Sequence, residues 1–244
     1  MTNKNNKNAF AGMNIEILIK NSIGDHSDVI NKLKEHFNIK GDFDNTACGG
    51  IYGEKSDVRI NFTCGHYIDA NVKGFRNEKE GFNQLTRTSV HKFCELFGLN
   101  SNEKYELENI VVSKSKNTKN PLFSEEQQKK WGVFFKTNVK KILKWGFSEN
   151  LNREILVLYN RNTSIVKIYA MKDVLKSLPT DIIFTKGGFN IGNCISFQRK
   201  GGNGSISKHP KTTIQHPGNN IQLKLIINKL IPVLESVKLT EYTI

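Results

Sequence analysis

Apolar and polar residues alternate in two neighbouring runs of the chain, at 58–62 and 68–72. Alternation with a period of two is typical of a β-strand that buries one of its faces. The residues Cys64-Gly65-His66 between the runs include a glycine, which favours a turn. The two runs therefore predict a β-hairpin with one apolar face and one polar face.

The polar face of this hairpin carries Asp57, Asn71 and Lys73. A hairpin folded about Gly65 places Lys73 opposite Asp57, and a slip of two residues places Asn71 there instead. Either register brings a carboxylate, a carboxamide and an ammonium group together on one face. The spacing alone also fits a surface salt bridge between Asp57 and Lys73, because opposite charges often face each other across strands.

Helical spacing of apolar residues predicts several helices. They are expected at Ala9–Ile23, from Asp25 or Ser27 to about Asn38, at Thr86–Phe97, and at Met171–Leu178. Ser124 and Gln127 form a capping box that predicts the start of a long amphipathic helix. The segment Ser113–Asn120 has the composition of a linker or exposed loop. Further strands are expected at Glu154–Tyr159, Ile165–Ala170, Asp181–Thr185, Cys194–Lys200 and Asn220–Ile227.

Length and composition are those of an ordinary globular protein. The 244 residues, 37% of them hydrophobic, can bury one large core or two modest ones. No apolar run is long enough to span a membrane, and no apolar signal core follows the polar residues 1–8, so we expect a cytoplasmic protein with no membrane partner. The four cysteines and six histidines lack the spacing of metal ligands, which disfavours a zinc site or a histidine metal centre.

The charge distribution indicates a polyanionic partner. The net charge is +13, and the 53 residues from Ile182 to Leu234 contain seven Lys or Arg residues and no Asp or Glu. Such a stretch is expected to form the wall of a groove that holds phosphates. The alternative is a general bias of composition, since the whole chain is rich in Lys, Asn and Ile.

The set of Asp57, Asn71 and Lys73 suits metal-assisted hydrolysis of a phosphodiester. Mg²⁺ prefers oxygen ligands, which Asp57 and Asn71 would supply. The cation would activate water and stabilise charge on a phosphoryl oxygen. Lys73 would orient the attacking water and stabilise the negative charge that develops on the phosphate.

Two motifs in the acid-free region suit contacts with bases. Gln198-Arg199-Lys200-Gly201-Gly202 ends one expected strand, and Gln222-Leu223-Lys224 lies in another. Gln can bind adenine through two hydrogen bonds, and Arg and Lys favour guanine. Gln222 and Lys224 are two residues apart on a strand, so they share a face.

Taken in order, these motifs resemble the small monomeric type II restriction endonucleases of the MspI/HhaI-like branch of the PD-(D/E)xK nucleases. Lys55-Ser56-Asp57 and Asn71-Val72-Lys73 resemble the acid–spacer–amide–x–lysine signature of that branch, in which Asn or Gln replaces the second acid. The two basic motifs resemble recognition motifs of its members. Gly81-Phe82-Asn83-Gln84 resembles a DNA-contacting loop, and Gly12 with Glu16 matches a glycine-x-x-x-glutamate pattern on the first helix.

The resemblance implies an α+β fold of two domains. The first, at 1–120, would be a catalytic domain with a central mixed β-sheet flanked by helices, as in restriction endonucleases. The second, at 121–244, would be a β-rich DNA-recognition domain. The implied activity is Mg²⁺-dependent cleavage of double-stranded DNA at a short G/C palindrome, with GCGC slightly favoured over CCGG, leaving 5′-phosphates. A bacterial cytoplasmic monomer and a cognate DNA methyltransferase as functional counterpart are implied as well.

The resemblance also implies roles for individual residues. Asp57, Asn71 and Lys73 would be catalytic, with Asp57 and Asn71 holding the metal. Glu16 would support the metal site, Ser56 would orient Asp57, and Asp69 is a reserve ligand on the same face as Asn71. The residues expected to contact DNA are Gln84, Gln198, Arg199, Lys200, Gln222 and Lys224.

The chain also departs from the family pattern. The loop 203–218 and the segment after Lys224 are longer than in the family. The alternatives are a DNA-binding protein without catalysis, such as a degenerate nuclease, and an RNA-directed or structure-selective nuclease.

Overall fold

The structure is a computed structural model that describes residues 7–49, 56–77, 80–81, 84–202 and 207–244. Lys55, Phe82 and Asn83, which belong to the motifs above, lie outside these residues. The chain forms two compact units, and each is made of separate segments. The first unit comprises Met1–Asn83, Ser148–Leu178 and Ile231–Ile244, and the second comprises Gln84–Phe147 and Pro179–Leu230.

The predicted division into 1–120 and 121–244 differs from these units. Residues after 147 return to the first unit because β6 (Glu154–Asn160) pairs in parallel with β3 (Tyr67–Asn77). The last strand, β12 (Lys238–Thr243), pairs with β7 (Ile165–Ala170) in the same sheet. Because these strands pair across long stretches of sequence, segments of the two units alternate along the chain.

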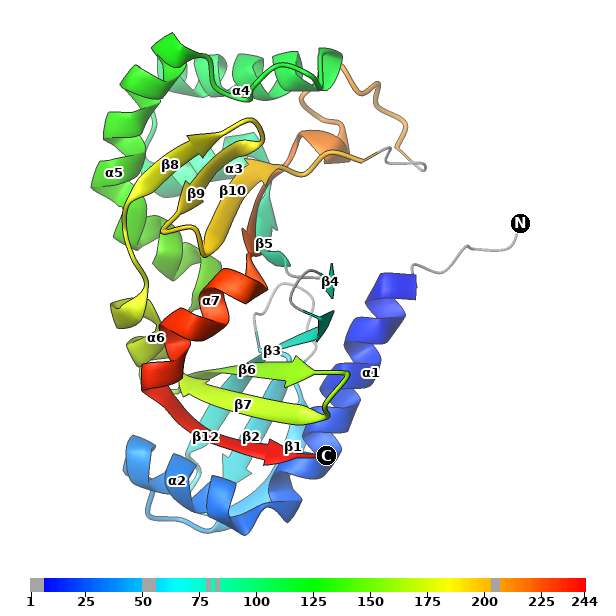
Figure 1. The fold of residues 1–244 in the computed structure, drawn as a ribbon, viewed down its shortest axis with the longest axis vertical. Helices are drawn as coiled ribbons and strands as arrows, with labels where there is room; N and C mark the ends of the chain where they lie inside the picture. The colour runs from blue at the N-terminus through cyan, green and yellow to red at the C-terminus, as the bar shows by residue number, and fades with distance from the viewer. Residues whose placement is uncertain (1–6, 50–55, 78–79, 82–83, 203–206) are drawn as a thin grey trace. The chain divides into compact units, whose positions relative to one another are not determined.

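The first unit is built on a mixed sheet. Among the described residues its strands follow the order β1-β2-β3-β6-β7-β12, with β1 at Phe43–Cys48 and β2 at Val58–Phe62, and the short β4 (Glu80–Gly81) pairs with β3. Helix α1 (Lys7–Ser22) runs along β1, β2 and β3, as Figure 1 shows in blue. Helix α2 (Ser27–Phe37) packs near β12, and α6 (Met171–Ser177) packs on β6 and β7.

The core of the first unit lies between α1, α2 and the apolar face of the sheet. Strand β2 alternates buried and half-buried residues as its sequence predicts, and Val58 and Ile60 are fully buried. Ile15 and Ile19 of α1 join the same hydrophobic cluster. Because one sheet face is buried in this way, the opposite face is left for the polar residues of β2 and β3.

The second unit is built on an antiparallel sheet that packs with helices. The strand order is β5-β11-β10-β9-β8, with bounds Gln84–Thr88, Ile221–Leu225, Ile195–Arg199, Gly188–Ile191 and Ile182–Thr185. Helices α3 (Val90–Phe97), α4 (Ser101–Lys116) and α5 (Glu125–Phe147) belong to this unit. Phe135 of α5 packs against Phe189 and Phe197 of the sheet. The aromatic stripe of α5 is therefore core, as its helical spacing predicts.

The remaining elements are short. They are the 3₁₀ helices η1 (Ile23–Asp25), η2 (Pro217–Asn219) and η3 (Glu235–Val237), and helix α7 (Ile227–Leu234), which runs from the second unit into the first. None of the helices in the part of the chain that the structure describes combines the length and the apolarity needed to cross a membrane.

Two local predictions were wrong. The helix predicted at Thr86–Phe97 begins only at Val90, because Ser89 caps it by accepting a hydrogen bond from Lys92 N at 3.1 Å, and 84–88 form β5. The segment 113–116, predicted as a linker, is the last turn of α4. Asn100 and Glu103 form the capping box that starts this helix.

Candidate functional site

The hairpin of β2 and β3 places Asp57 across from Asn71. Val58 pairs with Ala70 and Arg59 with Asp69, and the Asp57 N–H donates to Ala70 O at 2.9 Å. This is the second of the two registers considered above, in which Asn71 rather than Lys73 lies opposite Asp57. A slip of two residues leaves every side chain on its own face, so the polar set is the same.

Asp57 and Lys73 contact each other directly. Lys73 Nζ lies 3.4 Å from Asp57 Oδ2 and donates to Val72 O at 3.0 Å. Asp57 Oδ2 also accepts a hydrogen bond of 2.7 Å from Val72 N. The Asp57 side chain is 23% exposed and the Lys73 side chain 14%. The pair is therefore held in place by the backbone of β3 while remaining accessible at one end.

Asn71 lies on the same face, two residues before Lys73 on β3. It is buried, and its Oδ1 has no hydrogen-bond partner among the described residues. A buried acceptor without a partner costs about 1–3 kcal/mol, so such atoms usually serve a ligand or a water molecule. The orphaned oxygen of Asn71 and the carboxylate of Asp57 are the kind of donors that a hard divalent cation prefers.

Helix α1 brings a second carboxylate to the site. Gly74 of β3 lets α1 approach closely, because a Cβ built there would lie 2.2 Å from Ile15 Cδ1. Glu16, the next residue on α1, is half-buried, and burial is the main cause that raises its pKa above the ordinary value. The negative charge of Asp57 raises it further, and the positive charge of Lys73 lowers it. Glu16 therefore lies within the electrostatic field of the Asp57–Lys73 pair.

These residues fit a hard cation through oxygen donors. Within the described ranges, no group of three or more His, Cys, Asp or Glu side chains is arranged to hold a metal. A cation at this place would therefore depend on the amide oxygen of Asn71 and on oxygens from water or substrate.

Ser56 and Asp69 differ from their predicted roles. Ser56 Oγ donates to Asp69 Oδ1 at 3.1 Å and to Val58 O at 3.3 Å, so it orients Asp69 and not Asp57. Asp69 is buried and ion-paired with two arginines, Arg59 and Arg153. Its oxygens are therefore committed to these partners, which makes it a poor reserve ligand for a metal.

The second unit gathers predicted DNA-contacting residues on one face of its sheet. Gln222 of β11 pairs with Gln198 of β10, and Lys224 of β11 pairs with Ser196 of β10 and with Gln84 of β5. Residues paired directly across strands point to the same face. Gln222 is buried, and its side chain forms no hydrogen bond with the described residues. The amide of Gln222 is therefore available for a ligand, while Gln198 Oε1 accepts a hydrogen bond of 3.3 Å from Ser196 Oγ.

Arg87 belongs to the same face and was not predicted. Gln222 pairs with Arg87 on β5, so Arg87, Gln222 and Gln198 form a row across three neighbouring strands. Arg87 is exposed, and its positive charge helps to lower the pKa of Lys200, after the larger effect of burial. Simple alternation in 84–88 would have placed Arg87 on the face of the buried Leu85, because the two are two residues apart. The pairing with β11 is irregular between Leu223 and Lys224, and this shift places Arg87 and Gln84 on the face of Gln222 and Lys224.

Arg199 has a different environment from the other predicted contacts. Its Nε donates to Asn219 Oδ1 at 2.6 Å, and burial lowers its pKa. Asn219 is fully buried and donates in turn to Lys211 O at 2.9 Å and to Thr213 O at 2.6 Å. Arg199 thus fixes the segment 211–219 through Asn219. Gly201 and Gly202, with φ of 69° and 81°, form the turn after β10.

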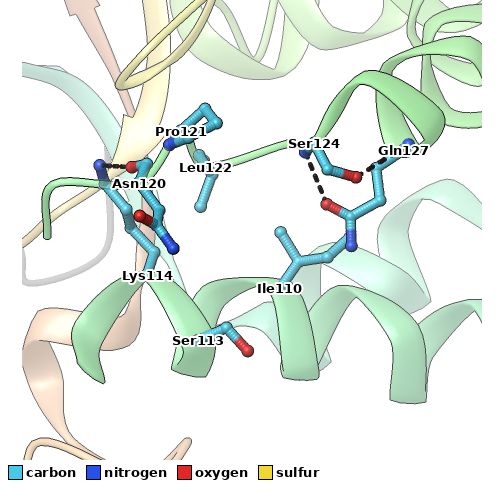
Figure 2. Close-up of a pocket in the computed structure, with 8 residues that line it drawn as sticks. All are labelled: Ile110, Ser113, Lys114, Asn120, Pro121, Leu122, Ser124 and Gln127. Atoms are coloured by element: carbon cyan, nitrogen blue, oxygen red, sulfur yellow. Dashed lines mark hydrogen bonds between the residues drawn. The ribbon is translucent and has the colours of Figure 1, made fainter. Parts of the chain in front are cut away.

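A separate cavity lies beside α4 and α5 in the second unit. Figure 2 shows that Lys114 and Asn120 line one end and that Ser124 and Gln127 line the other, where they form the predicted capping box. Lys114 Nζ donates to three carbonyl oxygens, those of Thr118, Asn120 and Lys186. Its donors are therefore used to fix the chain after α4.

The chain resembles known proteins in its fold and not in its sequence. No protein-family model matches the chain, and no curated protein matches its sequence. Among solved structures, the chain is similar to restriction endonuclease MspI in complex with its cognate DNA, with a TM-score of 0.51 and 15% sequence identity. The similarity covers 81% of this chain and 77% of the MspI chain. The chain therefore has a restriction-endonuclease-like fold, with a central mixed sheet flanked by helices, as its sequence predicts.

Proposed function

We propose that the protein is a Mg²⁺-dependent deoxyribonuclease of the type II restriction kind, which cuts double-stranded DNA. The observation that carries this proposal is the arrangement on β2 and β3: the Asp57–Lys73 contact of 3.4 Å next to the orphaned Oδ1 of Asn71. The fold supports it, because a solved structure to which the chain is similar is a restriction endonuclease bound to DNA. Fold alone does not determine activity, so the side chains carry the chemistry.

Lys73 is the residue best placed to act on the attacking water. Asp57 Oδ2 and Val72 O fix its ammonium group from two sides. An ammonium group has three N–H donors, so one remains for a water molecule or a phosphoryl oxygen. In that position Lys73 would orient the water in line with the leaving oxygen and stabilise the charge that develops on the phosphate.

Asp57 and Asn71 are the residues that would hold Mg²⁺. When bound, the cation would supply positive charge to the phosphate and lower the pKa of a water. Asp57 orients Lys73, since the two groups form an ion pair that is mostly shielded from solvent. Glu16 adds a nearby carboxyl group whose pKa is raised, chiefly by burial.

The sheet of the second unit would contact the DNA. Gln198, Gln222 and Lys224 would form hydrogen bonds with base edges, and Gln84, Arg87 and Lys200 would contact bases or phosphates. Arg199 would act mainly by fixing the segment that ends at Asn219. The acid-free sequence of this region favours a phosphate-binding role, and binding should fall by about 0.9 log units per log unit of salt for each phosphate neutralised.

The finer details of the proposal rest on the family resemblance. It implies a protein that acts as a monomer, recognises a G/C palindrome with GCGC favoured over CCGG, and leaves 5′-phosphate products. It also implies a cognate methyltransferase that protects the host DNA. A bacterial cytoplasmic location follows from the same resemblance.

Digestion of a supercoiled plasmid tests the function. The purified protein is incubated with plasmid in Mg²⁺, in Ca²⁺ and in EDTA, and the ends of the products are sequenced. Reproducible fragments with 5′-phosphates, formed only in Mg²⁺, are expected. Plasmid that stays supercoiled although the protein binds it would instead indicate a DNA-binding protein without catalysis. Cleavage of RNA with no cleavage of plasmid would indicate an RNA-directed nuclease.

A further inference from the structure

Two arginines flank one tyrosine on the polar face of the first unit. The guanidinium carbon of Arg59 lies 4.1 Å from the centroid of the Tyr67 ring, and that of Arg153 lies 4.2 Å from it. Arg59 belongs to β2 and Arg153 directly precedes β6, and these are the strands on either side of β3, which carries Tyr67. The ring therefore supports a guanidinium group from each neighbouring strand.

The charges of this cluster do not balance. Asp69 is the acid that pairs with both arginines, and its side chain is only 9% exposed. Arg59 binds it with two hydrogen bonds, from Nε to Oδ1 at 2.8 Å and from Nη2 to Oδ2 at 3.3 Å. A bidentate arginine already neutralises one carboxylate. Counting the ion pairs among the described residues, the second guanidinium leaves a surplus positive charge at this place.

Arg153 is the surplus group. Its Nε lies 3.7 Å from Asp69 Oδ2, too far for a hydrogen bond, and this buried nitrogen has no hydrogen-bond partner among the residues described. The side chain is 40% exposed and rests against Tyr67. Stacking restricts the guanidinium plane, so little conformational entropy would be lost when it binds an anion.

The position of the cluster matches a contact with the DNA backbone. Asp69, Asn71 and Lys73 share one face of β3, so the cluster lies about 7 to 14 Å from the proposed catalytic groups, at about 3.4 Å of strand per residue. Neighbouring phosphates on one strand of duplex DNA lie within that distance of each other, so the cluster could reach a phosphate beside the one at the catalytic groups. A guanidinium group binds a phosphate through parallel hydrogen bonds.

We propose that Arg153, supported by Tyr67 and Arg59, binds a DNA backbone phosphate that flanks the phosphate to be cut. This inference rests on the proposed function, because it takes DNA as the ligand. It assigns to Ser56 and Asp69 a supporting part, because Ser56 donates to Asp69 and Asp69 in turn holds Arg59 against the tyrosine.

The salt dependence of binding tests this contact. The affinity for a duplex of about 20 base pairs, chosen so that no proposed site is present, is measured between about 50 and 200 mM salt in EDTA. Arg153→Gln should lower the slope of log K against log salt by about 0.9, as expected for one lost phosphate contact. Lys172→Gln removes the same charge from an exposed position on α6 and should leave the slope unchanged.

A second variant separates charge from stacking. Arg153→Lys keeps the charge, so the slope should be close to that of the wild type, while the affinity falls at every salt concentration because the stacked, forked donor is lost. Thermal melting of each variant checks that it folds. A slope for Arg153→Gln equal to that of the wild type would overturn the inference.

The outcomes distinguish this contact from the nuclease proposal. Wild-type protein that cleaves plasmid while Arg153→Gln keeps the full slope would refute the phosphate contact alone. Wild-type protein that binds DNA and loses slope in Arg153→Gln, but never cleaves, would refute the nuclease and keep the contact. Wild-type protein that binds no DNA would refute both.

Discussion

The close approach of α1 to β3 at Gly74 can be tested by adding one methyl group. In Gly74→Ala the new Cβ would lie 2.2 Å from Ile15 Cδ1, 3.3 Å from Cγ1 and 3.5 Å from Cγ2. Carbon atoms in contact lie about 3.5–4.0 Å apart, so only the Cδ1 overlap is severe. Ile15 is buried in the core of the first unit, which limits how far its side chain can move away.

The expected cost follows from these distances. Overpacking of a core by a methyl group typically costs about 1–3 kcal/mol. Alanine in place of a strand glycine recovers about 0.5–1 kcal/mol. The free energy of unfolding of Gly74→Ala should therefore fall by about 1–2 kcal/mol, as measured by urea denaturation followed by circular dichroism. Cleavage should fall as well, because any shift of α1 moves Glu16 away from Asp57 and Lys73.

Ile15→Val provides the matched partner for this change. It removes Cδ1, and the closest remaining distance to the new Cβ is 3.3 Å. On its own it should cost about 0.5–1.5 kcal/mol. In the double variant the added methyl group fills the space of the lost one, so the cost should be smaller than the sum of the two single costs by about 1 kcal/mol or more. Costs that add within about 0.5 kcal/mol would refute the claim that the two residues are in contact.

Three further changes test the site and the DNA-contacting face. Asp57→Asn should abolish cleavage and lower the free energy of unfolding in urea by about 1–3 kcal/mol, because the amide oxygen still accepts from Val72 N while the mostly buried Lys73 ammonium loses its charged partner. A folded variant that still cuts would exclude Asp57 as a metal ligand. Glu16→Gln should raise the melting temperature at pH 7–8. Burial raises the pKa of Glu16, so the stability that Glu16 contributes is present below its ordinary pKa and is lost as pH rises through the raised pKa. Glutamine does not titrate, so the melting temperatures of the two proteins should agree below about pH 4 and separate as pH rises. A wild type that melts at a higher temperature than Glu16→Gln at pH 8 would contradict this. Gln222→Ala should weaken binding of the cognate duplex by about 1–3 kcal/mol with unchanged binding of other sequences, in a fluorescence titration; equal losses for both duplexes would mean that Gln222 does not contact bases.

The hairpin could be predicted from sequence because its signal is local. The alternation in 58–62 and 68–72 fixed which residues face the core, and β2 shows that pattern. The register could not be decided, because a slip of two residues preserves both faces. In the structure the turn decides it: Phe62 N donates to His66 O at 3.0 Å, and Gly65 N donates to Phe62 O at 2.9 Å.

Elements that depend on distant partners were missed or shortened. The strand β12 pairs with β7 and completes the first sheet, but the short sequence 238–243 shows no strong pattern of its own. The strand β5 is held by β11, and without that partner the local pattern predicts a helix from Thr86 instead of Val90. Pairing across long loops is governed by the tertiary structure, which local propensity does not report.

The candidate site likewise contains residues that local sequence could bring together and residues that it could not. Asp57, Asn71 and Lys73 belong to one hairpin, so their proximity followed from the alternation. The partners of Ser56 and Asp69 could not be predicted, because Arg153 reaches Asp69 only through the parallel pairing of β3 and β6. Arg87 was overlooked for an equivalent reason, since it meets Gln222 only once β5 lies beside β11.

The central claim is that Asp57, Asn71 and Lys73 form a phosphodiesterase site, and Lys73→Ala tests it most directly. The measurement is the initial rate of plasmid cleavage in Mg²⁺ for the wild type and the variant, with binding of the same DNA measured in EDTA. The account predicts that the variant binds DNA with nearly wild-type affinity and makes no cut above background. A variant that cleaves at the wild-type rate would contradict it.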